Sequence, residues 1–189
     1  MGVCNLEKKN ILVITGSPRK NGNSDKMAEA FIKGARSVGH EVTKFEAGKK
    51  KIDGCKACET CWSKGKPCSF QDDFDELTPL LEAADVIVFS TPLYWFSFST
   101  QIKAAIDKMY AYVGENCKRP LKIKESLLFV CGADDAINVF DGIKATYREI
   151  AHYMKWQDRG VMVVPNVNGK TDIEATDVLG KIEELGKSL

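Results

Sequence analysis

Histidine is scarce in this sequence, and so are long apolar runs and any excess of charge. Only two of the 189 residues are histidine, which leaves little support for a histidine-based catalytic triad or metal centre. Lysine and arginine total 27 against 26 aspartate and glutamate, so no net field favours nucleic acid or an anionic membrane. The longest apolar stretches, around residues 85–89 and 161–164, have the length of strands and cannot span a bilayer. We therefore expect a soluble protein that binds neither nucleic acid nor membrane.

Targeting signals are also lacking at the N-terminus. Residues 1–6 carry no apolar signal region, and Leu6 stands where a myristoylation motif needs serine or threonine. These absences predict a cytoplasmic location. Seven cysteines are many for that reducing compartment, and four of them fall within fourteen residues, which indicates metal or redox chemistry before structural disulfides. Cys4, Cys117 and Cys131 are isolated in the sequence and are interpreted as having no special role.

Short β-branched runs alternate with helical patterns, which is typical of βαβ units and of a parallel sheet covered on both faces. Strands are predicted at residues 10–15, 41–47, 85–90, 126–131 and 160–164. Each is followed by a predicted helix, and Asp73 is expected to cap the second of these helices. Five such pairs favour an α/β fold with a doubly wound five-stranded parallel sheet of order 2-1-3-4-5 and helices on both faces. Ligands bind such sheets at the carboxyl ends of the strands, between strands one and three.

The ordinary composition and length favour one domain over residues 1–189. Within it, residues 48–71 are predicted to be a cysteine-rich insertion.

A polar loop, GSPRKNGNS, follows the first strand at residues 16–24. Backbone N–H groups at the start of the next helix, supplemented by Ser17, Asn23 and Ser24, would form an anion site. The loop is one residue too long for a nucleotide-binding P-loop, and the sequence has no G-x-G-x-x-G dinucleotide motif. A single terminal phosphate fits better. The alternative is an ordinary polar turn in which Ser24 caps the helix.

Three consecutive aromatic residues, Tyr94, Trp95 and Phe96, follow the third strand on the other side of the same switch point. They cannot all point inward, so at least one should flank a crevice or a partner surface. A flat heteroaromatic ring would fit there. The alternative is a cap on the core or a subunit contact, for Phe96 in particular.

Residues 14–24 (ITGSPRKNGNS), residues 91–95 (TPLYW) and the cysteine loop resemble the NADPH-dependent FMN reductase group of flavodoxin-like proteins, and within it the iron–sulfur flavoproteins. The resemblance covers nearly the whole chain and implies a flavodoxin-like fold with FMN as the cofactor. It also implies the residues that hold FMN. These are Ser17, Arg19, Asn23 and Ser24 for the phosphate, Pro92, Leu93, Tyr94, Trp95 and Phe96 for the isoalloxazine ring, and Gly132, Ala133 and Asp134 as a third, weaker contact.

The cysteine loop holds Cys55, Cys58, Cys61 and Cys68 in a C-x2-C-x2-C-x6-C array. The first three match the spacing that bacterial ferredoxins use around a [4Fe–4S] cluster, and four thiolates supply a complete coordination shell. The loop is also longer than compact domains usually keep without a function or disorder. A Cys4 zinc site, reduced thiols that only pack, and a disulfide formed on handling are the alternatives.

The leading functional hypothesis is an FMN-dependent oxidoreductase. It would accept reducing equivalents from NAD(P)H, or from a ferredoxin through the cluster, and pass them to a small-molecule acceptor. The scarcity of acid–base residues suits this chemistry because the cofactor performs the redox step. The alternatives are a non-enzymatic flavodoxin-like electron carrier and a flavin- or metal-binding sensor. The near-neutral charge counts against the carrier, which is typically acidic. The resemblance further implies a homodimer or homotetramer, with Trp95 and Phe96 near a subunit interface.

Overall fold

The computed structural model describes residues 7–189. Cys4 and the residues that carry the targeting prediction lie outside this range. Across the described residues, no helix is both long enough and apolar enough to cross a membrane.

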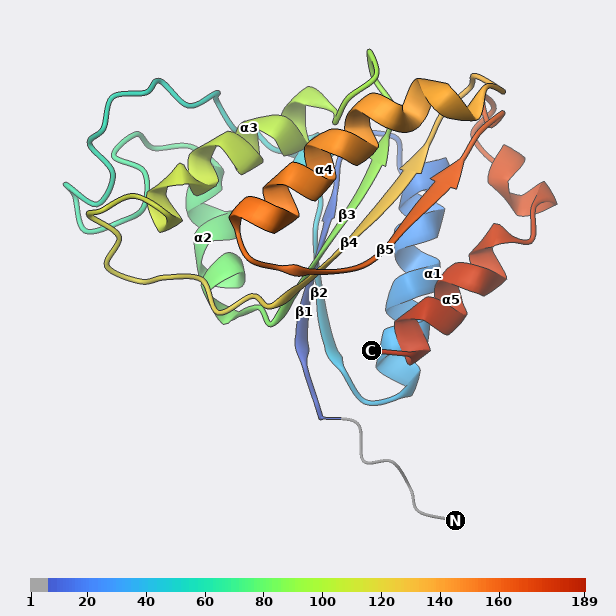
Figure 1. Cartoon of the computed structure of the whole chain (residues 1–189), viewed down its shortest axis with the longest axis horizontal. Coiled ribbons are helices and arrows are strands. Elements are labelled where there is room, and N and C mark those ends of the chain that lie inside the picture. The colour runs from blue at the N-terminus through green and yellow to red at the C-terminus, as the bar shows by residue number, and fades with distance from the viewer. Residues whose placement is uncertain (1–6) are drawn as a thin grey trace.

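Five parallel strands form one sheet at the centre of the molecule (Figure 1). They are β1 (Asn10–Thr15), β2 (Glu41–Phe45), β3 (Val86–Pro92), β4 (Glu125–Cys131) and β5 (Gln157–Val164). The spatial order is β2-β1-β3-β4-β5, which confirms the predicted topology. Strand β5 begins three residues earlier than the predicted strand at 160–164, because its polar start pairs with the start of β4 in the register Glu125 to Gln157.

The helices cover both faces of the sheet. They are α1 (Asn23–Ser37), α2 (Phe74–Ala83), α3 (Thr100–Lys108), α4 (Asp141–Tyr153) and α5 (Val178–Lys187). The described part of the chain also forms four short 3-10 helices: η1 (Ala47–Lys49), η2 (Met109–Tyr112), η3 (Ile137–Phe140) and η4 (Asp172–Ala175). Helices α1 and α5 lie on one face, whereas α2, α3 and α4 lie on the other (Figure 1).

Each face of the sheet has its own apolar core, because successive side chains of a strand point to opposite faces. In β1, Ile11 and Val13 pack with residues of α1 and α5. Leu12 and Ile14 pack with residues of α2, α3 and α4. All four are almost fully buried. A strand buried on both faces explains the continuous apolar run from which β1 was predicted.

The start of α2 confirms the position of one predicted cap but not its hydrogen bond. Asp73 is the N-cap residue of α2, yet its side chain makes no capping hydrogen bond to the helix. Its carboxylate accepts instead from the N–H of Lys51 at 2.8 Å, and Asp72 accepts from the N–H of Phe74 at 3.0 Å. Sequence spacing could not separate these roles, because the backbone partner of Asp73 is 22 residues away. The two aspartates close the base of the irregular segment that carries the four cysteines.

Candidate functional site

The three loops predicted to form the site meet at the carboxyl edge of the sheet. They follow β1, β3 and β4 and surround a cleft of about 170 Å³. The predicted residues that line it are Ser17, Arg19, Asn23, Ser24, Pro92, Leu93, Tyr94, Gly132 and Ala133. Two loops that straddle the switch point therefore share one cavity, as the strand order requires.

A fourth segment, which the sequence interpretation missed, completes the cleft. Val167, Asn168 and Lys170 follow β5 and line it as well. The carboxylate of Asp172 orders this segment by accepting from the N–H of Asn168 at 2.9 Å and of Gly169 at 2.6 Å. The signal that could have found it was the polar run NVNGK at the end of a fifth parallel strand.

The charges around the cleft suit an anion. Arg19 and Lys170 contribute two cationic side chains, and the described residues that line the cleft include no aspartate or glutamate. Helix α1 begins at Asn23 with no side-chain cap, so its first N–H groups, at the positive end of the helix dipole, stay available to a ligand. The cleft can therefore hold a phosphate through backbone and side-chain donors together.

Ser24 does not cap α1, so the alternative of an ordinary polar turn with Ser24 as the helix cap is not observed. Ser24 is buried, and its carbonyl accepts from the hydroxyl of Ser90 at 2.6 Å. The nearby carboxylate of Asp25 accepts from the N–H of Asn21 at 2.7 Å and pairs with Lys44 at 2.5 Å. This ion pair neutralises the carboxylate closest to the loop in sequence, so it does not oppose an anion in the cleft.

Two glycines let the loop after β1 pack closely against its neighbours. A Cβ at Gly16 would overlap the hydroxyl of Ser99, and a Cβ at Gly48, in η1, would overlap the backbone of Ser17. Helix η1 therefore packs directly against the loop. The hydroxyl of Ser17 accepts from the N–H of Arg19 at 3.1 Å, which fixes the turn between them.

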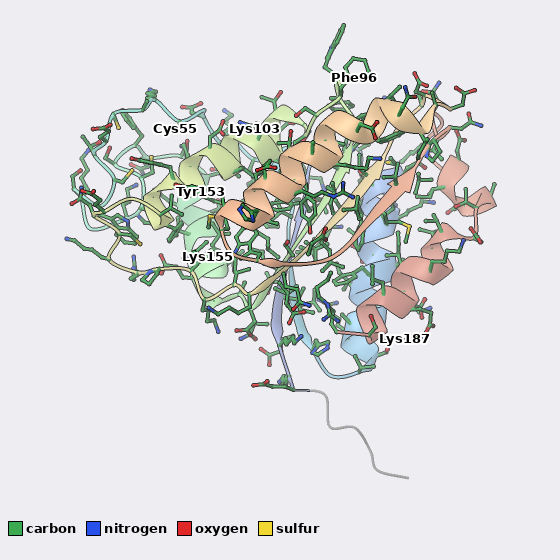
Figure 2. All side chains as sticks on the ribbon, viewed as in Figure 1. Cys55, Phe96, Lys103, Tyr153, Lys155 and Lys187 are labelled. Carbon is green, nitrogen blue, oxygen red and sulfur yellow. The ribbon has the colours of Figure 1, made fainter. Side chains whose placement is uncertain are left out.

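The aromatic loop forms a tight turn with its two central side chains outside the cleft. Tyr94 and Ser97 exchange backbone hydrogen bonds of 3.2 and 3.0 Å. Trp95 and Phe96, between them, have left-handed φ values of +47° and +63°, which such two-residue turns normally reserve for Asn-Gly. Trp95 is 93% exposed and Phe96 57%, and Phe96 projects from the edge of the molecule (Figure 2). The turn thus holds two large apolar side chains in solvent on a strained backbone.

Asp134 and Cys131 sit near the third loop and serve its structure. The carboxylate of Asp134 accepts from the N–H of Ala136 at 2.9 Å, and its carbonyl accepts from the N–H of Asn166 at 2.8 Å. Asp134 does not line the cleft, whereas Cys131 does. Burial raises the pKa of Cys131 to about 12, so its thiol stays protonated and unreactive.

The four clustered cysteines line a second cavity. Cys55, Cys58, Cys61 and Cys68 are all free thiols, and this cavity shares no lining residue with the cleft. Figure 2 shows Cys55 well away from Phe96. Around the thiols the backbone turns repeatedly through the left-handed region, at Ala57, Glu59, Trp62 and Gly65. These turns fold the segment back on itself, so that all four cysteines line the same cavity.

The surroundings of the thiols differ. Cys58 Sγ lies 3.0 Å from Thr60 Oγ1, and this hydrogen bond lowers the pKa of Cys58. Burial raises the pKa of Cys61, and the other three cysteines add to that effect. Within residues 7–189, no three His, Cys, Asp or Glu side chains lie close enough to hold a single metal ion as they stand. The cavity offers four sulfur donors without gathering them around one point.

Comparison with known proteins supports the resemblance. An iron–sulfur flavoprotein of Archaeoglobus fulgidus is 42% identical over 99 residues, which are 52% of this chain and 44% of that protein. One of Methanosarcina thermophila is 34% identical over 95 residues, or 50% of this chain and 49% of that protein. The alignments thus span about half the length of these relatives. A putative NAD(P)H-dependent FMN-containing oxidoreductase of Bacillus subtilis is 23% identical over 81% of this chain and 83% of its own.

Solved structures agree on the fold. An NAD(P)H:quinone oxidoreductase from Methanothermobacter marburgensis superposes with a TM-score of 0.74 at 13% identity, covering 96% of each chain. The sequence model of one family, described as NADPH-dependent FMN reductase, matches residues 9–168. That match includes the cleft loops after β1, β3 and β4 and the whole cysteine loop. On this evidence, the chain belongs to the NADPH-dependent FMN reductase family.

Proposed function

We propose that this protein is an FMN-dependent oxidoreductase that takes reducing equivalents from NAD(P)H and passes them to a small-molecule acceptor. The observation that carries the proposal is the cleft at the switch point, where an uncapped helix start and two cationic side chains meet an aromatic turn. When bound, FMN supplies the hydride and single-electron chemistry. The residues of the chain bind and orient it.

Each side of the cleft has a role in this proposal. Ser17, Arg19, Asn23 and Ser24, together with Lys170, would hold the phosphate, because they bring hydroxyl, amide and cationic donors to the start of α1. On the other side, Pro92, Leu93 and Tyr94 would support the flat ring, with Gly132 and Ala133 closing the cleft. Trp95 and Phe96 stand beyond the cleft in this structure and would cover the exposed edge of the ring or a partner surface.

We further propose a [4Fe–4S] cluster in the cysteine cavity, on Cys55, Cys58, Cys61 and Cys68. The relatives named iron–sulfur flavoproteins support it, and so does the all-sulfur donor set in one cavity. A zinc site gathers four ligands around one ion, whereas a four-iron cluster spreads them over four irons. All four thiols line one cavity, and the spacing of the first three matches the ferredoxin pattern of the cluster.

If the cluster is present, a ferredoxin could serve as a second electron donor, and the cluster would accept its electrons.

We also propose a cytoplasmic location, because four free thiols persist in a reducing compartment. A homodimer or homotetramer is proposed from the exposure of Trp95 and Phe96, since side chains of this size usually mark an interaction site. Light scattering of the purified protein measures the assembly directly.

Anaerobic purification followed by a visible spectrum, an iron and sulfide assay, and NAD(P)H oxidation with a quinone or free flavin tests both proposals. We expect a flavin spectrum, NAD(P)H oxidation, and about four irons per chain. Cys61→Ser should lose the iron and keep the flavin. Cys117→Ser is the matched control, because Cys117 does not line the cysteine cavity.

The two proposals fail separately. Protein that binds no FMN, as isolated or after FMN is added, contradicts the oxidoreductase. Iron-free protein with intact FMN contradicts only the cluster.

A further inference from the structure

A buried lysine faces the cysteine cavity. Lys108 ends α3, its side chain is only 3% exposed, and it lines the cavity together with the four cysteines. Its ammonium lies 5.6 Å from the centre of the Phe74 ring. Removing an ammonium from water carries a large free-energy penalty unless the charge is paired. This lysine therefore holds a localised positive charge against a cavity that cysteine thiols surround.

Asp72 holds that charge in place. Its carboxylate pairs with the Lys108 ammonium, and its side chain is 8% exposed. The same carboxylate accepts from the N–H of Asp53 at 2.9 Å and of Phe74 at 3.0 Å. These bonds tie Asp53, just before the four cysteines, and Phe74, at the start of α2, to the end of α3. Because Asp72 is anchored by backbone on both sides, Lys108 cannot swing away from the cavity without losing its partner.

The other charged side chains that line the cavity are exposed to solvent, unlike that of Lys108. Asp53, Lys56 and Glu59 are exposed, so water and salt screen them strongly. A charge inside the protein acts through a lower effective dielectric and has a larger influence on its neighbours. Among the described residues that line the cavity, Lys108 is the buried charged one.

We propose that Lys108 is a positioning charge that raises the reduction potential of the cluster in this cavity, and that Asp72 partly offsets it. The inference rests on the proposed cluster. Reduction adds one electron to the cluster, and a nearby fixed cation stabilises the more negative, reduced state. The anion of Asp72 acts in the opposite direction. The two residues would thus set how readily the cluster accepts an electron from the donor.

The test is a redox titration of the purified, cluster-loaded protein with dithionite as the reductant, followed by electron paramagnetic resonance. Lys108→Met should shift the potential to a lower value, and Asp72→Asn should shift it to a higher one. Lys108→Arg keeps the charge and should restore a potential near that of the wild type. Lys103→Met is the matched control, because Lys103 lies on the same helix in an exposed pair with Asp107 and should leave the potential unchanged.

Opposite shifts distinguish a charge effect from a structural one, since loss of packing would disturb both variants in the same way. Shifts of the same sign, or no shift in either variant, overturn the inference while leaving the cluster in place. If Lys108→Met does not fold, the upward shift of Asp72→Asn decides alone. Wild-type protein that incorporates no iron and sulfide overturns the proposed cluster, and this inference with it.

Discussion

The side chain of Asn23 donates a hydrogen bond of 2.8 Å to the backbone carbonyl of Gly169, which joins the first loop of the cleft to the last. Its amide oxygen accepts from the N–H of Ile173 at 3.3 Å. Asn23 and Gly169 are 146 residues apart in the sequence. The side chain predicted to bind phosphate therefore also holds together two walls of the phosphate site.

Asn23→Ala removes both of these bonds. We expect the free energy of unfolding to fall by about 1–3 kcal/mol and FMN to bind more weakly, because the segment after β5 loses its link to α1. Urea unfolding and a fluorescence titration with FMN measure the two effects. Asn116→Ala is the control, because Asn116 is exposed and lies outside the cleft. Equal FMN affinity in both variants would argue against this role for Asn23.

Gly48→Ala tests the support beneath the phosphate loop. The added methyl group would overlap the backbone of Ser17, so η1 or the loop must move. We expect a loss of about 1–3 kcal/mol in unfolding free energy and weaker FMN binding. At Gly180, in α5, a Cβ meets nothing within 4 Å, so Gly180→Ala should instead stabilise the protein by about 0.5–1 kcal/mol. If both variants lower the unfolding free energy, or both raise it, the packing argument is contradicted.

Replacing Trp95 and Phe96 by Asn and Gly relieves the strained turn. Both residues have left-handed φ values, which cost a non-glycine residue about 1–3 kcal/mol each. The double variant should therefore unfold at higher urea concentration than the wild type. It should also oxidise NAD(P)H more slowly or assemble less completely, because it loses two exposed apolar side chains. A double variant with unchanged stability would show that the turn is not strained.

Asp85 links stability to pH. Burial raises its pKa, but a hydrogen bond from the N–H of Asn10 and the ion pair with Lys122 outweigh burial, so the pKa lies below the ordinary value of 3.8. A carboxylate whose pKa is lowered on folding stabilises the folded state above its unfolded pKa. That contribution disappears as the pH falls through the folded pKa.

Asp85→Asn should lower stability near neutral pH and flatten its decline in acid. Urea midpoints from about pH 7 to about pH 2 measure this decline. The exposed Asp141 provides the control Asp141→Asn, whose curve should run parallel to that of the wild type. If the curve of Asp85→Asn also runs parallel to that of the wild type, Asp85 does not link stability to pH.

Much of the fold followed from the sequence because its signals are local. The apolar run of β1 and the polar loop at residues 16–24 are contiguous, and so is the TPLYW run after β3. Each can be interpreted without knowing what packs against it. Where the signal was not local, the prediction was incomplete. The polar start of β5 forms a strand only because β4 pairs with it, and Asp73 stands at the predicted N-cap position but its side chain bonds to Lys51 rather than to its own helix.

The sequence by itself determined the alternation of strands and helices and the grouping of the cysteines, since periodicity and spacing are properties of neighbouring residues. The strand order and the switch point were expected only as those of the doubly wound fold that this alternation favours. Only the tertiary structure decided which side chains share a cavity. It added Lys170 to the cleft and left Trp95 and Phe96 outside it. It also buried Lys108 against thiols that lie 40 or more residues away in the chain. Contacts at that separation depend on how the sheet and its helices pack, and no short stretch of sequence records them.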